Sequence, residues 1–522
     1  MQQPASIFND VIGPVMIGPS SSHTAASVRI GQVIRSMMRG QARKVVFQFS
    51  TQGSLATTYI GQGSAFGLAA GILGLAPDNA RVADALTMAK SAGVEIEFQL
   101  IDEPCDHPNV YKVTMWDNDD QCISAEMVSV GGGMIEVRKI ENIPVLLGGG
   151  YYETIFLLGN LPETEAGEIH TDGSALMASS GLSYDEISLH HNEQGDYLIN
   201  IKSTVPIGEK AGSLIPVGKR LDIDPVLPIL SQKDYRGLFN TAEEMLAIAK
   251  AEHLHPWELA VKYESLRGGI SPEEVLEKMT HIVRVIKRTM DLSEAEQNEY
   301  QDRILGRQAY KLDAAKLLEG AVMNEVVKRI TLMMEGKSSM KVIVAAPTAG
   351  SCGVVSGTLF GVAKVMRLEE DALVKGMMTA GLIGTIIAEH ATFAGEVGGC
   401  QAECGSASGM AAAGVVQLMG GTVEQALDAA SMALQNVLGM VCDPVADRVE
   451  VPCLGKNIMC GCNALAMANL AMAGFDKVVP LDETIRAMAQ VGNMIPVELR
   501  CTGKAGLSVL KTSTEIWHKL ND

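Results

Sequence analysis

"EVGGCQAECGSASGMAAAG", residues 396–414, places Cys400 and Cys404 four positions apart in a run of glycine, alanine and serine. This composition predicts a tight turn that leads into an alanine-rich helix, because alanine has the highest helix propensity. A lone pair of cysteines in such a helix is more often a pair of small buried side chains than a functional site. Whether these thiols have a chemical role therefore depends on which other residues join them.

The same composition extends through most of the second half of the chain. From residue 340 onward glycine, alanine and methionine dominate, which is typical of closely packed helices joined by tight loops. Upstream, Thr241 and Glu244 form a Thr-x-x-Glu capping box, and a Ser-Pro pair at 271–272 marks a second helix N-terminus. We therefore expect residues 234–522 to form one large, all-helical domain.

The first half mixes two periodicities. Residues 44–53 ("KVVFQFSTQG") and 94–103 ("VEIEFQLIDE") alternate like strands, whereas residues 23–38 repeat apolar side chains at helical spacing. We therefore expect residues 1–150 to form an α+β domain.

The segment between these two domains is less regular. Residues 151–210 contain three strand-like runs around a short helical run at 173–181. They predict either a small regulatory-type sandwich or an extension of the first sheet. Residues 211–233 contain three prolines and show no clear period, so we expect the linker there.

Composition and charge limit the classes of partner. The chain has 522 residues, of which 47% are hydrophobic, and 42 basic against 61 acidic residues give a net charge of −19. This balance argues against a nucleic-acid or anionic-membrane surface, so we expect small-molecule partners. The N-terminus lacks a signal sequence, and the apolar run "GMMTAGLIGTIIA" (376–388) is too short for a membrane span. We therefore expect a cytoplasmic protein.

Ten cysteines in a cytoplasmic chain of this length predict reduced thiols or metal ligands, not a disulfide framework. Most of them follow residue 350: Cys352, Cys400, Cys404, Cys442, Cys453, Cys460, Cys462 and Cys501. Three lie beside glycine or proline, in "VGGCQAE", "VCDPVAD" and "EVPCLG", where irregular backbone can point thiolates at an iron-sulfur cluster. The spacing excludes a zinc ribbon and a ferredoxin run, which leaves a site assembled from distant loops.

These motifs resemble those of the iron-sulfur-dependent L-serine dehydratases. "GCQAE", "CDPV" and "VPC" in the second half are joined by "IGPSSSHTA" (17–25), "HPN" (107–109), "GGG" (131–133) and "APTAGSCG" (346–353) in the order of that family. The resemblance therefore covers both halves, and it implies an α+β substrate-binding part fused to a larger all-helical part that carries the cluster.

The resemblance also implies a cofactor and a reaction. A 4Fe-4S cluster is expected on Cys400, Cys442 and Cys453, with one iron free of protein thiolates to act as a Lewis acid on the substrate's β-hydroxyl. A base removes the Cα proton, the hydroxyl leaves, and the resulting enamine is hydrolysed, which converts L-serine to pyruvate and ammonia. No pyridoxal phosphate is needed.

The remaining motifs are assigned roles around that iron. The serines of "GPSSSHT" lie at a predicted helix start and are expected to bind the substrate carboxylate, although they also fit an ordinary helix cap. Arg500 is a second candidate for the carboxylate, and His107 and Asn109 are expected to orient the substrate or move a proton. The expected substrate-binding residues are Ser20, Ser21, Ser22, His23, Thr24, Gly350 and Arg500, and the expected catalytic residues are His107, Asn109 and Thr348.

The chain departs from the family pattern at several positions. Gln62 and Ala65 replace the histidine and aspartate of the family's G-H-x-T-D motif, which removes a candidate base. Cys501 stands where glutamate is common, and Ser356 replaces a proline. The chain ends in "KLND" and not in the cysteine that caps the open iron in some relatives, so Cys404, Cys501 or water is left to cap it.

Alternative functions follow from these departures. The same chemistry on another β-hydroxy amino acid is one, and a non-catalytic relative that binds a ligand or regulates, with a structural or redox-sensing cluster, is another. A zinc or thiol-redox protein built on Cys460 and Cys462 is a third. A small-molecule amino-acid substrate and a homodimer are the expected partners.

Overall fold

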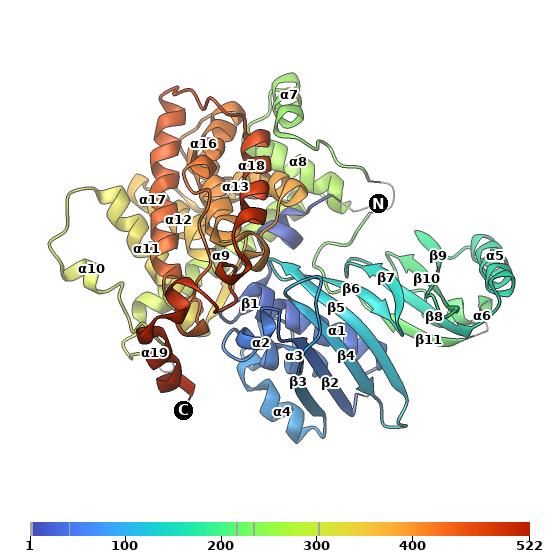
Figure 1. The fold of residues 1–522 in the computed structure, drawn as a ribbon. Coiled ribbons are helices and arrows are strands. Elements are labelled where there is room, and N and C mark those ends of the chain that lie inside the picture. The colour runs from blue at the N-terminus through green and yellow to red at the C-terminus, as the bar shows by residue number, and fades with distance from the viewer. Residues whose placement is uncertain (1–3, 41, 216–217, 233–234, 301–302, 522) are drawn as a thin grey trace.

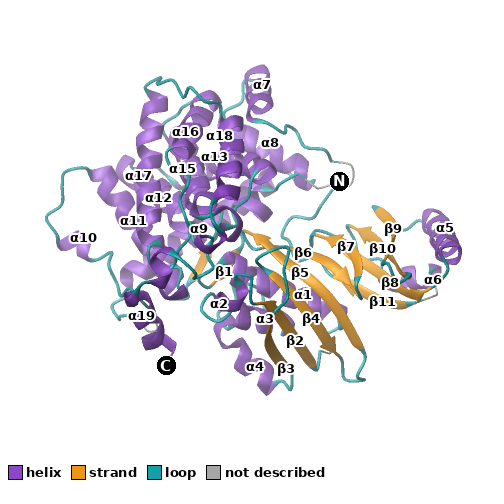
Figure 2. Ribbon diagram, in the orientation of Figure 1, coloured by secondary structure: helices purple, strands orange, loops and turns teal. Residues whose placement is uncertain are grey.

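The computed structural model describes residues 4–40, 42–215, 218–232, 235–300 and 303–521. Figure 1 shows a mixed α+β part, a smaller sheet with its own helices at one edge of it, and a large helical part. Figure 2 shows that strands are concentrated in the first half and helices in the second, as the sequence predicts.

The first part is built on a mixed sheet with the strand order β3-β2-β4-β5-β6-β7. Its strands are β2 (Lys44–Ser50), β3 (Glu95–Ile101), β4 (Val110–Trp116), β5 (Cys122–Gly131), β6 (Met134–Ile140) and β7 (Ile143–Leu147). Its helices are α1 (Ala26–Met37), α2 (Leu55–Thr58), α3 (Ser64–Ile72), α4 (Ala85–Ser91) and the turn η3 (Val82–Asp84). In β2 the side chains of Val45, Phe47 and Phe49 alternate into the core, where they join the apolar face of α1.

Two glycines let helices α1 and α3 cross at short distance. A Cβ at Gly71 would overlap the carbonyl oxygen of Val28, and a Cβ at Gly31 would overlap that of Leu68. This contact fixes α3, and with it the loop that carries Gln62, against the N-terminal end of α1.

Residues 152–223 form a separate antiparallel sheet with the order β11-β8-β10-β9. Its elements are β8 (Tyr152–Asn160), α5 (Glu163–Ser179), β9 (Glu186–His191), β10 (Asp196–Ser203), α6 (Gly208–Leu214) and β11 (Lys219–Ile223). One face of the sheet packs on α5 and α6, and the other adds Leu198 and Leu221 to the core of the first part. It is therefore neither a sandwich nor an extension of the first sheet.

The expected linker at 211–233 was wrong over most of its length. It begins inside α6, and residues 219–223 pair with β8 as an edge strand because Leu221 and Ile223 alternate into the core. Two of its prolines, Pro225 and Pro228, lie after β11, where the chain leaves the sheet.

The helical part contains most of the remaining elements. They are α7 (Ala242–Glu252), α8 (Pro256–Gly268), α9 (Pro272–Ala295), α10 (Lys311–Ala314), α11 (Ala321–Ser338), α12 (Cys352–Met366), α13 (Glu370–His390), α14 (Gly395–Gly398), α15 (Ser406–Leu418), α16 (Val423–Gln435), α17 (Cys453–Met472), α18 (Leu481–Met494) and α19 (Lys511–Asn521). Short turns at η5 (Val445–Asp447), η6 (Val497–Leu499) and η7 (Gly506–Val509) join them near the C-terminus. Helix α13 is long and apolar enough to cross a membrane, yet most of it is buried in this helical core.

The two large parts share structure, which corrects two expectations. The second part is not all-helical, because β12 (Val342–Val344) pairs antiparallel with β1 (Val15–Ile17) of the first part. The N-terminal turn η1 (Ile7–Val11) packs against α13 in the helical core, so the first residues of the chain do not belong to the α+β core. Apolar side chains on both sides of these contacts account for the pairing.

Candidate active site

A buried pocket lies where the α+β part meets the helical part. The α+β part contributes Ser20, Ser22 and Gln62. The helical part contributes Gly350, Glu396, Cys400, Glu403, Cys404, Cys442, Pro444, Val449, Cys453 and Cys501. The three cysteines that the sequence predicts as cluster ligands therefore face one pocket, together with two further cysteines.

Loops and helix starts bring these thiols together. Cys400 directly precedes the π-helical turn η4 (Gln401–Gly405), and Gly399 before it has a φ of 73°, which favours glycine. Cys453 opens α17. The backbones of Cys442 and Cys501 run side by side, with the Cys501 N–H donating to the Cys442 carbonyl at 2.8 Å. Residues more than 100 positions apart thus share one site.

The donor set fits an iron-sulfur cluster. The Cys400 and Cys442 sulfurs lie within 4.8 Å of each other and of a Glu403 oxygen. Hydrogen bonds to Cys400 and Cys501 raise the pKa of Cys442, and burial followed by the charge of Cys400 raises that of Cys453. Clustered buried thiols of this kind lose their protons when a metal centre supplies the compensating positive charge.

Two lysines supply positive charge beside the thiols. The Lys456 ammonium lies 3.8 Å from the Cys400 sulfur and forms an ion pair with Asp443 at 3.0 Å. Lys337 is fully buried and donates to the Val449 carbonyl, and its charge offsets part of the rise that burial causes in the pKa of Cys453. These cations favour thiolates, which are the form that binds metals.

Two carboxyl groups of the pocket, the buried Glu396 and the half-buried Glu403, are not among the site residues predicted from the sequence. Thr348 Oγ1 donates to Glu403 Oε2 at 2.6 Å, and burial together with the charge of Glu396 raises the pKa of Glu403 to about 7. Burial also raises the pKa of Glu396. Glu403 belongs to the quoted "GCQAE" motif and could have been found there, but Glu396 stands in a glycine-rich run with no such signal.

His23 faces Glu396 with a defined tautomer. Thr58 Oγ1 donates to the Ser54 carbonyl at 2.7 Å, so it accepts from His23 Nε2 at 2.8 Å. Burial lowers the pKa of His23 to about 3, so the ring is neutral and its Nδ1 carries a lone pair. This Nδ1 lies 3.0 Å from Ser20 Oγ and 3.5 Å from Glu396 Oε1, where it can accept a hydrogen bond.

The other residues of the serine-rich motif also reach the site or its walls. Ser21 Oγ accepts from the Ala349 N–H at 3.2 Å, which ties η2 (Ser21–Ala25) to the "APTAG" loop. Thr24 Oγ1 donates to the Gln62 carbonyl at 2.8 Å. Asn457 holds the same loop by donating to the Gly350 carbonyl at 2.8 Å.

The "HPN" element lies behind Glu396. Asn109 is fully buried beside Glu396, and its side-chain amide makes no hydrogen bond of regular geometry among the described residues. His107 does not line the pocket; its Nδ1 accepts from the Asn109 N–H at 3.2 Å. Burial, followed by the charge of Arg138, lowers the pKa of His107 to about 4.

Arg500 also lies outside the pocket. Its guanidinium donates to the carbonyls of Asn493 and Ile495, both at 2.7 Å, at the end of α18. The structure therefore gives it a helix-end partner and does not bring it to the serines.

Two of the residues that depart from the family pattern, Gln62 and Cys501, are in contact in the structure. The Gln62 amide lies 3.5 Å from the Cys501 sulfur, so the positions usually held by histidine and glutamate are in contact across the pocket. Ala65 is buried at the start of α3, and Ser356 donates to the Cys352 carbonyl inside α12. Positions 62 and 501 are therefore neighbours in the wall of the pocket.

Cys460 and Cys462 do not form a redox pair with each other. Both lie in α17, where residues two apart point to different sides of a helix. Cys460 is buried toward Cys404, whereas Cys462 is half-buried. This placement does not favour a site built on those two thiols.

Comparison with known proteins assigns both parts of the chain. Residues 239–508 match the family described as "Serine dehydratase alpha chain", and residues 7–100 match "Serine dehydratase beta chain".

Named relatives match about half of this chain. The "Probable L-serine dehydratase, alpha chain" of Bacillus subtilis is 37% identical over 287 residues, which are 54% of this chain and 95% of that protein. The "L-serine dehydratase, alpha chain" of Peptoniphilus asaccharolyticus is 38% identical over 283 residues, 53% of this chain and 97% of that protein. An "L-serine dehydratase" of Streptomyces coelicolor is 31% identical over 278 residues, 52% of this chain and 61% of that protein. The chain therefore belongs to the serine dehydratase family, with its beta-chain and alpha-chain parts fused in one polypeptide.

Proposed function

We propose that this protein is an L-serine dehydratase that converts L-serine to pyruvate and ammonia with a 4Fe-4S cluster held by Cys400, Cys442 and Cys453. One observation carries the proposal: these thiols line a single buried pocket together with Ser20 and Ser22 of the α+β part. When bound, the cluster supplies a Lewis-acidic iron that activates a hydroxyl leaving group.

Substrate binding is assigned to the serine-rich motif. The Ser20 and Ser22 side chains face the pocket, and Ser20 caps the helical segment that continues through α1. Hydroxyls and free N–H groups at a helix start bind a carboxylate well. We assign Thr24 and Gly350 to shaping this carboxylate-binding site. Thr24 holds the backbone of Gln62, and Gly350 is held by Asn457.

Proton transfer is assigned to the carboxyl group behind these serines. Glu396 takes the Cα proton, which its raised pKa helps it to hold, and the neutral His23 Nδ1 lies 3.5 Å from its Oε1. Asn109 is buried beside Glu396, and His107 fixes the Asn109 backbone by accepting from its N–H. Loss of the Cα proton and of the β-hydroxyl as water gives aminoacrylate, which tautomerises to an imine and is hydrolysed to pyruvate and ammonia.

Thr348 and Glu403 form the second polar wall. Thr348 also exchanges hydrogen bonds with Ser351, which closes the loop at the start of α12. We assign Thr348 to holding the Glu403 carboxyl in place beside the cysteines.

The test is anaerobic reconstitution of the purified protein with iron and sulfide, followed by a keto-acid assay on L-serine, L-threonine and their D-forms. We expect about four irons per chain and pyruvate from L-serine. Iron incorporation with turnover of L-threonine alone would move the substrate to another β-hydroxy amino acid. A zinc-loaded, colourless protein after reconstitution would refute the cofactor.

A second candidate is a non-catalytic relative that binds an amino acid beside its cluster. The contact between Gln62 and Cys501 favours it, because neither side chain replaces the base that the family's motif supplies. Gln62→His with Ala65→Asp distinguishes the two. If the wild type is inactive with its cluster loaded and this double variant gains turnover of L-serine, the non-catalytic assignment holds.

We also propose a cytoplasmic homodimer without a nucleic-acid or membrane partner. Exposed apolar side chains on the helical part support an interface between copies; they include Met459, Phe475, Val478 and Met494. Sedimentation equilibrium should give twice the chain mass of 55.5 kDa. A species of single-chain mass at micromolar concentration would contradict the dimer.

A further inference from the structure

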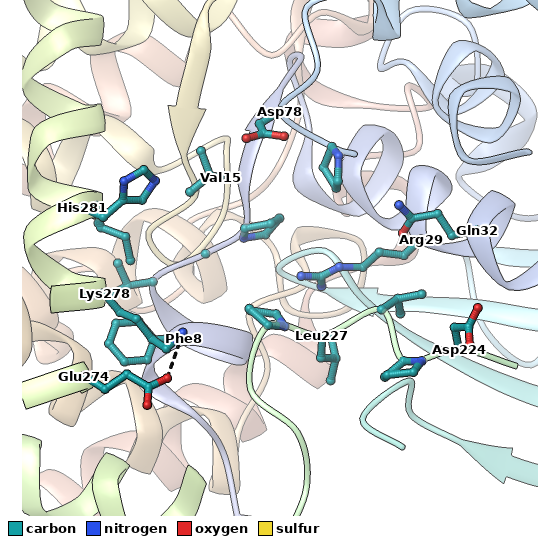
Figure 3. A pocket seen from close by; sticks show the side chains of 18 of the residues that line it. Phe8, Val15, Arg29, Gln32, Asp78, Asp224, Leu227, Glu274, Lys278 and His281 are labelled. Carbon is teal, nitrogen blue, oxygen red and sulfur yellow. Dashed lines mark ion pairs between the residues drawn. The ribbon is translucent and has the colours of Figure 1, made fainter. Parts of the chain in front are cut away.

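A second cavity lies apart from the cysteine pocket and shares no lining residue with it. It measures about 1460 Å³ and opens between the N-terminal segment, α1, the loop that follows β11, and α9. Figure 3 shows Arg29 and Gln32 of α1 on one side, with Glu274, Lys278 and His281 of α9 on the other. The cavity therefore lies between elements of the α+β part and elements of the helical part.

Arg29 is the buried charge of this cavity. The residue is only 2% exposed, and Figure 3 shows its side chain extending from α1 into the cavity above Leu227. Its Nη1 donates to the Gly133 carbonyl at 2.7 Å, but its Nε has no acceptor in the part of the chain that the structure describes. Asp10 acts on it only through space, without an ion pair.

A buried guanidinium with an unused donor has the properties of a binding site for an anionic ligand. Burying a charge without a paired counter-charge costs several kcal/mol, and a bound carboxylate offsets part of that cost. Arginine also presents donors in a fork that matches the two oxygens of a carboxylate. The unpaired Nε thus indicates an anionic group of a ligand.

The mouth of the cavity carries the opposite charge. Its acidic lining residues are Asp78, Asp222, Asp224, Glu273, Glu274 and Glu277. The other cations there have partners within the protein. Arg35 donates to the Ile72 carbonyl at 3.1 Å, and Lys278 pairs with Glu274 at 3.5 Å. An acidic mouth repels a polyanion, so a single carboxylate accompanied by a positive group fits both regions.

The walls between these charges are apolar. Phe8 and Ile12 are buried at one side, while Val15 and Leu227 are half-buried and face the space. A hydrocarbon group placed against them would leave water and gain about 25 cal/mol for each Å² buried.

We propose that this cavity binds a free α-amino acid with an apolar side chain. Its carboxylate pairs with Arg29, its ammonium faces the acidic mouth, and its side chain packs against Phe8 and Leu227. Because the ligand would touch both α1 and α9, its binding links the α+β part to the helical part. This site does not depend on the reaction proposed above, since the two pockets share no residue.

The first test is calorimetric titration of the full-length protein, kept anaerobic, with L-leucine. L-leucinamide lacks the carboxylate and 4-methylpentanoate lacks the ammonium, and each should bind at least tenfold more weakly than L-leucine. L-serine should also bind at least tenfold more weakly at this site. Equal binding of L-leucinamide, or no heat with L-leucine at about 10 mM, would overturn the proposal.

Variants locate the binding. Arg29→Gln should weaken L-leucine binding at least tenfold, and Leu227→Trp should do the same by occupying the space proposed for the ligand's side chain. Leu292→Trp, on an exposed part of α9 outside the cavity, is the matched control and should bind L-leucine like the wild type. Unchanged binding in the folded Leu227→Trp protein would place the ligand elsewhere and refute the site. Pyruvate formation from L-serine, measured in the same samples, tests the proposed reaction separately.

Discussion

Individual cysteines in this chain differ in surroundings, and the difference predicts which are ligands. Cys442 is buried between Cys400 and Cys501, whereas Cys122 is exposed at the end of β5. Cys442→Ala should therefore lose the cluster, measured as iron per chain and visible absorbance, while Cys122→Ala should retain both. A full iron content in the folded Cys442→Ala protein would show that this thiol is not a ligand.

Glu396 and His107 should respond differently to substitution. Glu396→Gln keeps the size of the side chain but removes the group that accepts the proton, so kcat should fall about 10²-fold or more with iron content unchanged. His107→Ala acts only through the Asn109 backbone and should cause a smaller fall, because His107 does not line the pocket. Equal loss in both variants would make His107 itself a catalytic residue.

The close crossing of α1 and α3 can be tested at the level of the helix pair. Gly71→Ala places a Cβ against the Val28 carbonyl and should destabilise the protein by about 1–3 kcal/mol, the usual cost of overpacking. Gly167→Ala is the matched control, because a Cβ at this position of α5 meets nothing within 4 Å. That variant should gain up to about 1 kcal/mol from helix propensity. Thermal unfolding of both proteins measures the contrast.

The small sheet contains a buried carboxyl that makes its stability depend on pH. Glu153 on β8 is 2% exposed, and burial raises its pKa to about 7 although Asn200 donates to it at 2.9 Å. The folded state therefore holds this proton at pH values where the unfolded chain, with a pKa near 4.5, has lost it. Stability falls as pH rises from about 4.5 to 7, by about 3 kcal/mol from this group.

Glu153→Gln removes that dependence. Its Tm relative to the wild type should rise between pH 5 and pH 8, while Glu193→Gln, in an exposed turn of the same sheet, should show no such trend. A constant difference between Glu153→Gln and the wild type across this range would mean that the carboxyl is already ionised at pH 5.

Elements with a long apolar period are predictable from the sequence, and short ones are not. Strand β2 and helix α1 repeat buried residues over 7 and 12 positions, so their type is clear from the pattern. Strands β1 and β12 have 3 residues each, and each forms only because the other lies beside it. Strand β11 has only 5 residues and prolines lie on both sides of it, so the sequence pattern there predicts a linker and not a strand.

The residues of the site also differ in how well the sequence predicts them. Cysteines beside glycine and proline are recognisable in a single sequence, because irregular backbone and thiols together indicate a metal site. The contact between His23 and Glu396 joins segments that are far apart in the chain, so no local sequence pattern predicts it. The same holds for the contact between Gln62 and Cys501, which lie 439 positions apart in the chain.

At the scale of the whole molecule, the N-terminal turn η1 is one of the contacts that join the two parts, together with the β1–β12 pair and the hydrogen bond between Ser21 and Ala349. Ile7 and Val11 lie against Gly381 and Gly384 of α13, where added Cβ atoms would press on their side chains. The space between η1 and α13 is so small that a single added methyl group should disturb the packing. We therefore expect this contact to contribute to the coupling between the two parts when they unfold.

A double-mutant cycle tests that contribution. Gly384→Ala should destabilise the protein and separate its unfolding into two transitions, because its Cβ would overlap Val11 Cγ1 and displace η1. Val11→Ala alone should cost less, since it only leaves a small cavity. Combined with Gly384→Ala it removes the obstructing methyl, so the double variant should be more stable than the sum of the single changes predicts, by about 1 kcal/mol. Strict additivity in calorimetry would show that η1 does not couple the α+β part to the helical part.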